Sequence, residues 1–402
     1  MRMNKKKEIV PKFRFPEFQR DGIDFVHGNK LFKSITNKNH NSDLPILAIT
    51  QDQGAVPRDQ IEYNVTVTDK SLSNYKVVEV GDFIISLRSF QGGIEYSRFK
   101  GICSPAYIIL RKREENISEL YYKYFFKTWR YIQSLNRNLE GIRDGKMISY
   151  SQFSSVKVPY PRSFKEQQKI ADCLSSIDEL IDAENRKLKA LEKYKKGLMQ
   201  KLFPAEGKTL PEWRFPEFRG KSEWRIKPLG KICTNYDSRR IPITEKDRVK
   251  GEIPYIGASG VIDYINDFIF DEDLLCVSED GANLVARTYP IAFSISGKTW
   301  VNNHAHVLKF SHKYTQDIVE SYLNMINLQD FLTGMAQPKL NRAKLDIIPI
   351  PLPEEEEQQK IANCLSEVDK IITEQSNKVE QLKAHKKGLM QGLFPSLEEA
   401  DV

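Results

Sequence analysis

The 402-residue chain has few cysteines, few histidines and no long apolar run. Its five cysteines, at positions 103, 173, 233, 276 and 364, are scattered and odd in number, which favours free thiols in a reducing compartment over disulfides. No segment approaches the roughly 20 apolar residues of a membrane-spanning helix. The basic N-terminus is followed by no apolar stretch, so we expect neither a signal peptide nor a membrane partner. The sequence therefore predicts a cytoplasmic protein.

The motifs of a self-sufficient enzyme are also missing. Residues 296–299 read Ser-Gly-Lys-Thr, like the end of a phosphate-binding loop, but Ala292 stands where that loop requires glycine. We find no glycine-rich dinucleotide fingerprint and no Asn/Asp-Pro-Pro-aromatic methylation motif. His304 and His306 share one strand face, yet no cysteine or acidic residue near them in the sequence completes a metal site. We therefore predict no catalytic residues, no metal site and no cofactor bound by this chain.

What the sequence does contain is a block of about forty residues that occurs twice. The first copy begins Glu-Gln-Gln-Lys-Ile-Ala-Asp-Cys-Leu-Ser at 166–175 and ends Lys-Lys-Gly-Leu-Met-Gln-Lys-Leu-Phe-Pro at 195–204. The second begins almost identically at 357–366 and ends at 386–395. Such a repeat sets the architecture, and it divides the chain into two copies of one plan, a globular segment followed by a long helix.

Apolar residues in each block follow alternating steps of three and four, the a and d spacing of a coiled coil, over about five heptads. Polar residues interrupt both stripes at matching places, Glu184 and Lys195 in one and Gln375 and Lys386 in the other. We predict that the two helices pack as an antiparallel coiled coil within one chain, with pairing between molecules as the alternative. The predicted seam consists of Ile170, Leu174, Ile177, Ile181, Leu188, Leu191, Leu198, Ile361, Leu365, Val368, Ile372, Val379, Leu382 and Leu389.

The predicted fold class is α+β, with two mixed α/β domains joined by two long antiparallel coiled-coil helices in a pseudo-twofold internal repeat. We expect the first domain at 1–162, the first helix at 163–204, the second domain at 205–353, and the second helix with its tail at 354–402. Proline-punctuated straps open the two halves at 10–18 and 210–218, and we expect the first to lie beside the end of the second helix. Strands are predicted at 83–86, 106–110, 274–278, 291–295 and 305–308, and aromatic helices at 119–129 and 318–325.

Polar loops after the predicted strands are suited to contacts with bases and phosphates. The loop at 88–93 combines Arg88 and Gln91 with glycines, and these side chains can pair with guanine and adenine edges. The net charge of +7 permits a nucleic-acid partner without requiring one, and ordinary solvated loops are the alternative. The candidate DNA-binding residues are Arg88, Ser89, Gln91, Arg143, Lys146, Asn283, Arg287, Lys298, Asn302, Asn303, Gln337 and Lys339.

Together, the helix starts, the helix ends and the segments 253–260 and 334–341 resemble the specificity subunit of type I restriction–modification systems. The resemblance covers essentially the whole chain. It implies a non-catalytic subunit whose two target-recognition domains read an asymmetric, bipartite sequence in double-stranded DNA. It also implies two methyltransferase subunits and two restriction (motor-nuclease) subunits as partners, which hold S-adenosylmethionine, ATP and Mg.

The first half departs from the second, because residues 141–146 stand where residues 337–339 stand in the other half. Residue roles inferred in one half therefore transfer poorly to the other. Two further interpretations remain open, a coiled-coil scaffold whose globular ends bind proteins and a solitary DNA-binding regulator.

The predicted seam can be tested with Leu191→Asp and Leu382→Asp. Each variant places a charge in an apolar interface, at a cost on the order of several kcal/mol, and we expect loss of soluble protein or of assembly. Expression yield and size-exclusion chromatography with the partner subunits measure this. Normal expression, DNA binding and assembly of both variants would contradict the intramolecular coiled coil.

Overall fold

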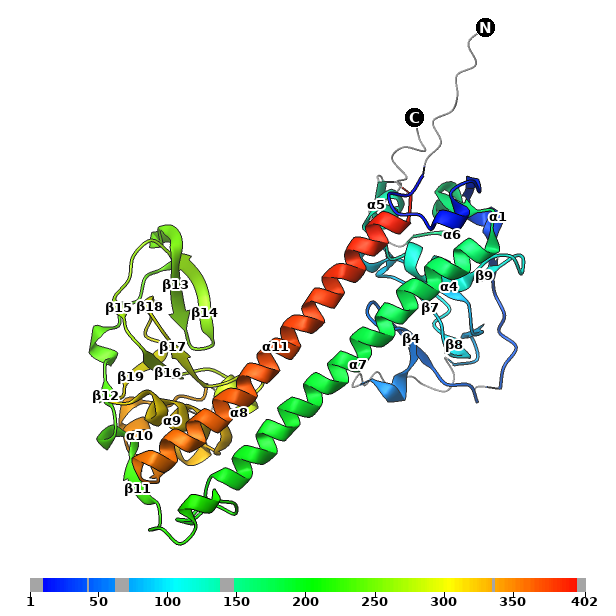
Figure 1. Ribbon diagram of the computed structural model, residues 1–402. Coiled ribbons are helices and arrows are strands. Elements are labelled where there is room, and N and C mark those ends of the chain that lie inside the picture. The colour runs from blue at the N-terminus through cyan, green and yellow to red at the C-terminus, as the bar shows by residue number, and fades with distance from the viewer. Residues whose placement is uncertain (1–9, 42, 62–71, 138–147, 335–336, 396–402) are drawn as a thin grey trace. The chain divides into compact units, whose positions relative to one another are not determined.

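The computed structural model describes residues 10–41, 43–61, 72–137, 148–334 and 337–395 (Figure 1). The chain folds as two compact units, unit 1 with residues 1–184 and 378–402, and unit 2 with residues 185–377. Both boundaries fall within long helices, α7 (Phe164–Leu202) and α11 (Glu355–Leu393), so each unit contains part of both helices. Among the described residues, no helix is long and apolar enough to span a membrane.

In unit 1 the main sheet has the strand order β2-β9-β6-β7, with antiparallel neighbours throughout. Three further antiparallel pairs, β1–β10, β3–β4 and β5–β8, complete the strands described in this unit. The strands are β1 (Ile23–His27), β2 (Phe32–Ile35), β3 (Leu47–Thr50), β4 (Gly54–Pro57), β5 (Lys76–Val78), β6 (Phe83–Ile85), β7 (Glu95–Tyr96), β8 (Gly101–Cys103), β9 (Ile108–Lys112) and β10 (Lys157–Pro161). The short helices are α1 (Gly28–Leu31), α3 (Ser89–Gly92), α4 (Glu119–Phe125), α5 (Trp129–Arg137) and α6 (Tyr150–Ser155).

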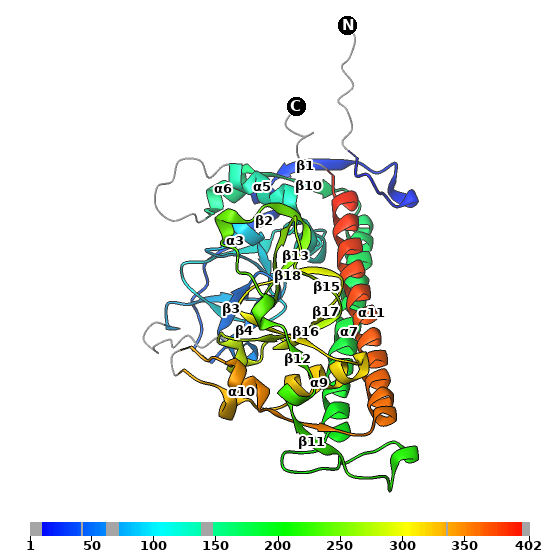
Figure 2. The ribbon, with the colours of Figure 1, turned by 90° about the vertical axis from the view of Figure 1, so that its left-hand side faces the viewer.

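In unit 2 the main sheet has the order β12-β19-β16-β17, and a second sheet has the order β14-β13-β18-β15. Figure 2 labels β12, β16 and β17 of the main sheet and β13, β15 and β18 of the second. β13 and β18 are parallel, and β11 pairs with β20. The strands are β11 (Arg225–Pro228), β12 (Thr234–Asn235), β13 (Lys250–Gly257), β14 (Gly260–Ile265), β15 (Phe270–Asp271), β16 (Leu274–Ser278), β17 (Ala292–Ile295), β18 (Lys298–Val301), β19 (Ala305–Lys309) and β20 (Pro349–Leu352). The short helices are α8 (Asn283–Ala286), α9 (Lys313–Met325) and α10 (Arg342–Asp346).

The two units follow the same topology although their sequences differ. The main sheets correspond strand for strand, and the pairs β3–β4 and β5–β8 of unit 1 correspond to β13–β14 and β15–β18 of unit 2. A parallel bridge between Ile46 and Ile102 even matches the parallel contact of β13 with β18. The predicted strands are found as β6, β9, β16, β17 and β19, and the predicted aromatic helices fall within α4–α5 and α9. The α+β class and the internal repeat are therefore confirmed.

In unit 1 the two long helices run antiparallel. Lys386 of α11 forms an ion pair with Asp178 of α7, and Lys378 Nζ lies 2.5 Å from Glu184 Oε1. Residue numbers rise along one helix as they fall along the other. Lys386 and Glu184, two of the polar interruptions seen in the sequence, thus have partners on the facing helix.

Unit 2 repeats this arrangement with the roles of the helices exchanged. Lys195 Nζ of α7 lies 2.5 Å from Asp369 Oδ1 of α11, and Leu202 shares a core cluster with Ile361. Lys195 and Asp369 stand at the positions of the repeat that Lys386 and Asp178 occupy in unit 1. All fourteen predicted seam residues are buried or half-buried.

The end of one helix completes the core of each unit. In unit 1, Phe394 at the end of α11 packs on Tyr121 and Phe125 of α4, with ring centroids 5.1 and 5.6 Å apart. In unit 2, Phe203 at the end of α7 packs on Trp224 and Tyr322, with centroids 6.3 and 5.7 Å apart. Each Phe-Pro end of the repeat is therefore a core element as well as a helix stop.

The proline-punctuated straps pack on these helix ends. The Phe13 amide donates to the Gly392 carbonyl at 2.8 Å, and the Trp213 amide donates to the Lys201 carbonyl at 2.9 Å. A side chain at Gly392 would collide with the Phe13 ring. The first strap thus lies beside the end of α11, as its sequence repeat predicted.

A buried ion pair joins each strap to the first turn of a long helix. Arg14 Nε and Nη2 donate to the two carboxylate oxygens of Glu166 at 2.8 and 2.9 Å. Arg214 makes the same paired contact with Glu357 at 2.7 and 2.6 Å. The side chains of Glu166 and Glu357 are only 1% and 2% exposed, so solvent cannot replace the arginine.

We therefore expect Arg214→Met to destabilise unit 2 by about 3–5 kcal/mol, because it leaves the Glu357 carboxylate buried without its partner. The shift of the urea unfolding midpoint measures this. Arg162 offers a matched control, since it makes an equally regular paired contact with Asp24, at 2.7 and 2.8 Å, on the protein surface. Arg162→Met should leave the midpoint unchanged within error. Equal effects of the two variants would show that burial does not decide the strength of these pairs.

Candidate nucleic-acid interface

In unit 1 the predicted loop at 88–93 follows β6 and forms the short helix α3. Arg88 and Gln91 are exposed, whereas Ser89 is buried and its Oγ accepts a hydrogen bond from the Ser86 amide at 2.9 Å. Gly93 has a φ of +83°, and an added Cβ would lie 2.2 Å from the Phe126 carbonyl. The loop therefore requires glycine there, and it presents Arg88 and Gln91 outward while Ser89 supports it from within.

An ion pair between the buried Glu95 and the partly buried Lys127 lies under this loop. Lys127 forms an ion pair with Glu95, and its Nζ also donates to the carbonyls of Gly92 at 2.9 Å and Gln51 at 3.1 Å. Burial lowers the pKa of Lys127 and raises the pKa of Glu95, and each opposite charge counters the shift of the other. The pair thus fixes two loop carbonyls from inside the unit. The other unit 1 candidates, Arg143 and Lys146, lie outside the described residues.

In unit 2 three loops meet at one surface. The Lys339 Nζ lies 3.3 Å from Glu279 Oε1, and the Gly281 amide donates to the Pro338 carbonyl at 3.1 Å. His304 Nδ1 lies 2.9 Å from Asp280 Oδ2. Residues 279–281, 302–304 and 337–340 thereby form one connected surface, which carries the exposed candidates Asn303, Gln337 and Lys339.

Three other candidates in unit 2 make contacts within the protein. Asn283 is buried, and its side chain donates to the Tyr289 carbonyl and accepts from the Thr288 amide. Arg287 donates to the carbonyls of Leu284, Leu323 and Ile326 at 3.1, 3.1 and 2.9 Å. Asn302 is buried and accepts from the His304 amide at 2.8 Å. These three side chains stabilise turns and helix ends within unit 2.

Lys298, the remaining candidate, is the exposed first residue of β18, directly after the turn that follows β17, with its Nζ 4.6 Å from the centroid of the Phe268 ring. Gly297 beside it has a φ of +67°. This turn contains the Ser-Gly-Lys-Thr segment that resembles part of a phosphate-binding loop. It links two β-strands, whereas a phosphate-binding loop leads into a helix.

A network that the sequence did not predict lies under the three loops of unit 2. His306 Nδ1 lies 2.6 Å from Asp237 Oδ2, and Arg240 Nη1 donates to Glu279 Oε2 at 2.7 Å. The ligand atoms of Asp237, Glu279 and His306 lie within 4.8 Å of one another, so the fold supplies the acidic neighbours that the sequence around His306 lacks. Their contacts with Arg240 occupy this cluster, and a metal ion would have to compete with a guanidinium.

Burial alone would raise the pKa of Asp237, but the hydrogen bond and the charge of His306 lower it overall. Burial has the same opposing effect on Glu279, where the contact with Arg240 and the charge of His306 lower the pKa. Both carboxylates are therefore ionised near neutral pH, as the network requires.

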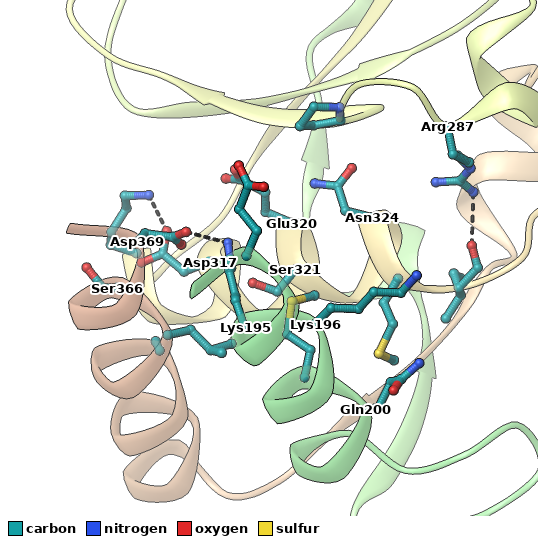
Figure 3. Close-up of a pocket in the computed structure, with 18 residues that line it drawn as sticks. Lys195, Lys196, Gln200, Arg287, Asp317, Glu320, Ser321, Asn324, Ser366 and Asp369 are labelled. Carbon is teal, nitrogen blue, oxygen red and sulfur yellow. Dashed lines mark hydrogen bonds and ion pairs between the residues drawn. The ribbon is translucent and has the colours of Figure 1, made fainter. Parts of the chain in front are cut away.

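The repeated helix ends line a pocket in each unit. In unit 2, Lys195, Lys196 and Gln200 of α7 face Asp317 and Glu320 of α9 across a pocket of about 700 Å³ (Figure 3). Arg287 and Asp369 also contribute to its wall, which includes Met199.

In unit 1 the equivalent residues of α11 line a pocket of about 610 Å³, opposite Trp129 and Arg130 of α5. These helix residues are Lys386, Lys387, Met390 and Gln391. Trp129 is 68% exposed. One wall of the pocket is thus the same in both units, whereas the other is acidic in unit 2 and basic and aromatic in unit 1.

Comparison with known proteins agrees with this duplicated architecture. The family model described as "Type I restriction modification DNA specificity domain" matches residues 21–193 and 221–383. The chain is 25% identical over 355 residues to the type I restriction enzyme MjaVIII specificity subunit of Methanocaldococcus jannaschii, covering 81% of this chain and 80% of the relative. It is 33% identical over 153 residues to a putative type I restriction enzyme specificity subunit of Haemophilus influenzae, and that alignment spans 38% of this chain and 39% of the relative.

A crystal structure of the type I restriction–modification S subunit from M. genitalium has a TM-score of 0.59 at 15% identity, covering 96% of this chain and 99% of that one. A second solved chain, from a study of complex assembly and conformational transition of the type I system, has a TM-score of 0.57 at 14% identity and covers 93% and 97%. At these identities the likeness concerns the fold. Since the family model matches most of the chain, in two copies, the protein belongs to the family of type I restriction–modification DNA specificity subunits.

Proposed function

We propose that this chain is the non-catalytic, sequence-specific DNA-binding subunit of a type I restriction–modification complex, and that each unit reads one part of an asymmetric, bipartite target. The observation that carries the proposal is the contrast between a repeated frame and unlike loops. Helix ends, straps and ion pairs recur at equivalent positions, while the loop at 86–94 between β6 and β7 differs in length and sequence from its equivalent at 279–291 between β16 and β17. A shared frame with different loops is what two readers of different sequences require.

The exposed side chains are the proposed DNA contacts. Arg88 and Gln91 in unit 1, and Asn303, Gln337 and Lys339 in unit 2, have the fork-shaped or cationic groups that pair with base edges and phosphates. Lys298 is a further phosphate contact, and Arg143 and Lys146 stay predictions. Ser89 and Asn302 hold their own loops from within, whereas Asn283 and Arg287 hold the turn after α8 and the end of α9.

The domain boundaries remain part of the proposal, with target-recognition domains at 1–162 and 205–353 and long helices at 163–204 and 354–402. The partners are double-stranded DNA, two methyltransferase subunits and two restriction subunits. S-adenosylmethionine, ATP and Mg would be held by those partner subunits. A subunit that reads cellular DNA works where that DNA is, in the cytoplasm.

We further propose that one methyltransferase subunit docks at each repeated helix end. The pockets of both units share lysine, methionine and glutamine at equivalent positions. Core packing explains the buried Met199 but not the exposed lysines, which are repeated all the same. Lys196 and Lys387 are exposed in these pockets and would pair with a carboxylate of the partner. The same partner can therefore recognise both sites through the same residues.

Two other functions make different predictions. A protein-binding scaffold would show no salt-sensitive binding to DNA, and a solitary regulator would bind its target fully without methyltransferase subunits. Gel-shift titrations of target and random duplexes, with and without methyltransferase and at two salt concentrations, separate the three. We expect tight, sequence-dependent binding only when methyltransferase is present, with affinity falling as salt rises.

Independent reading predicts modular specificity. Replacing residues 20–155 with those of a family member of different specificity should change one part of the methylated target and leave the other part intact. Methylome sequencing of cells that express the chimera with its methyltransferase measures this. A change in both parts would argue against one reader per unit.

Docking at both helix ends predicts two methyltransferase subunits per chain, to be counted by native mass spectrometry. Lys196→Glu and Lys387→Glu each reverse one exposed charge, so each variant should lose one methyltransferase, and the double variant should lose both. Lys208→Glu, an exposed lysine outside both pockets, serves as the control. A single methyltransferase at saturation on the unmodified chain would rule out the two-site arrangement.

A further inference from the structure

His306 is the centre of the buried network in unit 2. Its side chain is 1% exposed, with Nδ1 2.6 Å from Asp237 Oδ2 and Nε2 2.7 Å from the Leu340 carbonyl oxygen. Both neighbours are hydrogen-bond acceptors, so both contacts form when each ring nitrogen carries a hydrogen. Asp237 Oδ1 in turn accepts from the Val307 amide at 2.9 Å. The ring therefore links β19 to the segment that follows Lys339.

Arg240 connects this centre to the other two loops. Its Nη1 donates to Glu279 Oε2 at 2.7 Å and to the carbonyls of Ala305 at 2.8 Å and Asn303 at 3.4 Å. The Glu279 carbonyl accepts from the Leu340 amide at 2.8 Å, and the Glu279 amide donates to the His304 carbonyl at 2.9 Å. A few buried charges thus fix the backbone from which Asn303, Gln337 and Lys339 project.

Unit 1 contains a smaller counterpart. The Lys127–Glu95 pair fixes the carbonyls of Gly92 and Gln51 behind the exposed Arg88 and Gln91. The Glu95 side chain is 3% exposed and that of Lys127 is 26% exposed, and the Lys127 ammonium is turned toward Glu95 and the loop carbonyls. In both units, then, buried ionic groups hold a loop whose outward residues are candidates for base contacts.

We infer that these two ionic networks, around His306 in unit 2 and Lys127–Glu95 in unit 1, are positioning elements that determine which bases each unit accepts without contacting DNA. The inference rests on the proposed function. Paired hydrogen bonds to a base edge require side chains placed to a fraction of an ångström, and a loop that moves loses discrimination before it loses attraction to phosphates. The networks are local to their units, so each affects one part of the target.

The test uses His306→Asn and Lys127→Met in the complete chain with its methyltransferase. Asparagine can still donate to Asp237 but cannot reach the Leu340 carbonyl, and methionine removes all the donors of Lys127. Arg240→Lys is a milder second variant, because lysine keeps the positive charge but lacks the several N–H donors of the guanidinium group. Arg214→Met is the matched control, since it breaks a buried ion pair of unit 2 that joins the strap to α11 and not to these loops.

Two readouts are combined. Hydrogen–deuterium exchange should increase in residues 279–283 and 337–341 for His306→Asn, and in residues 88–93 for Lys127→Met, with the loops of the other unit unchanged. Competition binding with duplexes that carry one mismatch should show discrimination falling by about tenfold in one part of the target, a different part for each variant. The salt dependence of binding should stay the same, because the phosphate contacts are kept. A purely structural effect, as in Arg214→Met, should leave discrimination unchanged in the protein that remains folded.

Unchanged exchange in the named loops, in His306→Asn and in Arg240→Lys alike, would overturn the inference. Increased exchange with unaltered discrimination, or with equal losses in both parts of the target, would overturn it too. If the unmodified chain with methyltransferase binds no two-part target, the proposed function is wrong, and the networks have no role in base specificity. In that case the exchange data still show whether the networks hold the loops, so the two failures can be told apart.

Discussion

The antiparallel pairing of two repeated helices is the constraint on which the rest of each unit depends. The core of unit 1 needs Leu393 and Phe394, which come from the far end of the sequence, to cover Tyr121 and Phe125. Unit 2 uses Phe203 in the same way. A unit built without the second helix would expose these aromatic surfaces, so the two halves of the sequence cannot be separated into independent proteins at the repeat boundary.

The helix ends, straps and buried arginine–glutamate pairs form one repeated support. Because each strap is tied to a helix end through its backbone and to a helix start through a buried ion pair, the base of each domain is held at several points. The loops that carry the candidate DNA contacts take no part in the strap contacts. They are therefore able to differ between the units, which is the physical basis for two readers of different sequences on one frame.

Within the candidate interface, the structure exposes only some of the side chains that the sequence predicted to contact DNA. Arg88 and Gln91 are exposed, but Ser89 between them is buried, because a short helix turns one side of the loop inward. Arg287 was expected to face DNA, and it instead donates to the carbonyls that end α9. Polar residues in a loop look alike in the sequence, and only the local backbone decides which ones point outward.

The sequence by itself determined the duplication, the heptad spacing, the antiparallel pairing and most strands, because these follow from periodicity and from repeated blocks. Tertiary structure alone decided which charges meet. Asp237 lies 69 residues from His306 in the sequence, and Glu95 lies 32 residues from Lys127, so no local sequence pattern predicts either pair. Such contacts depend on which turns, helices and strands the fold brings together, and the interactions that stabilise a buried charge form only once those elements have packed.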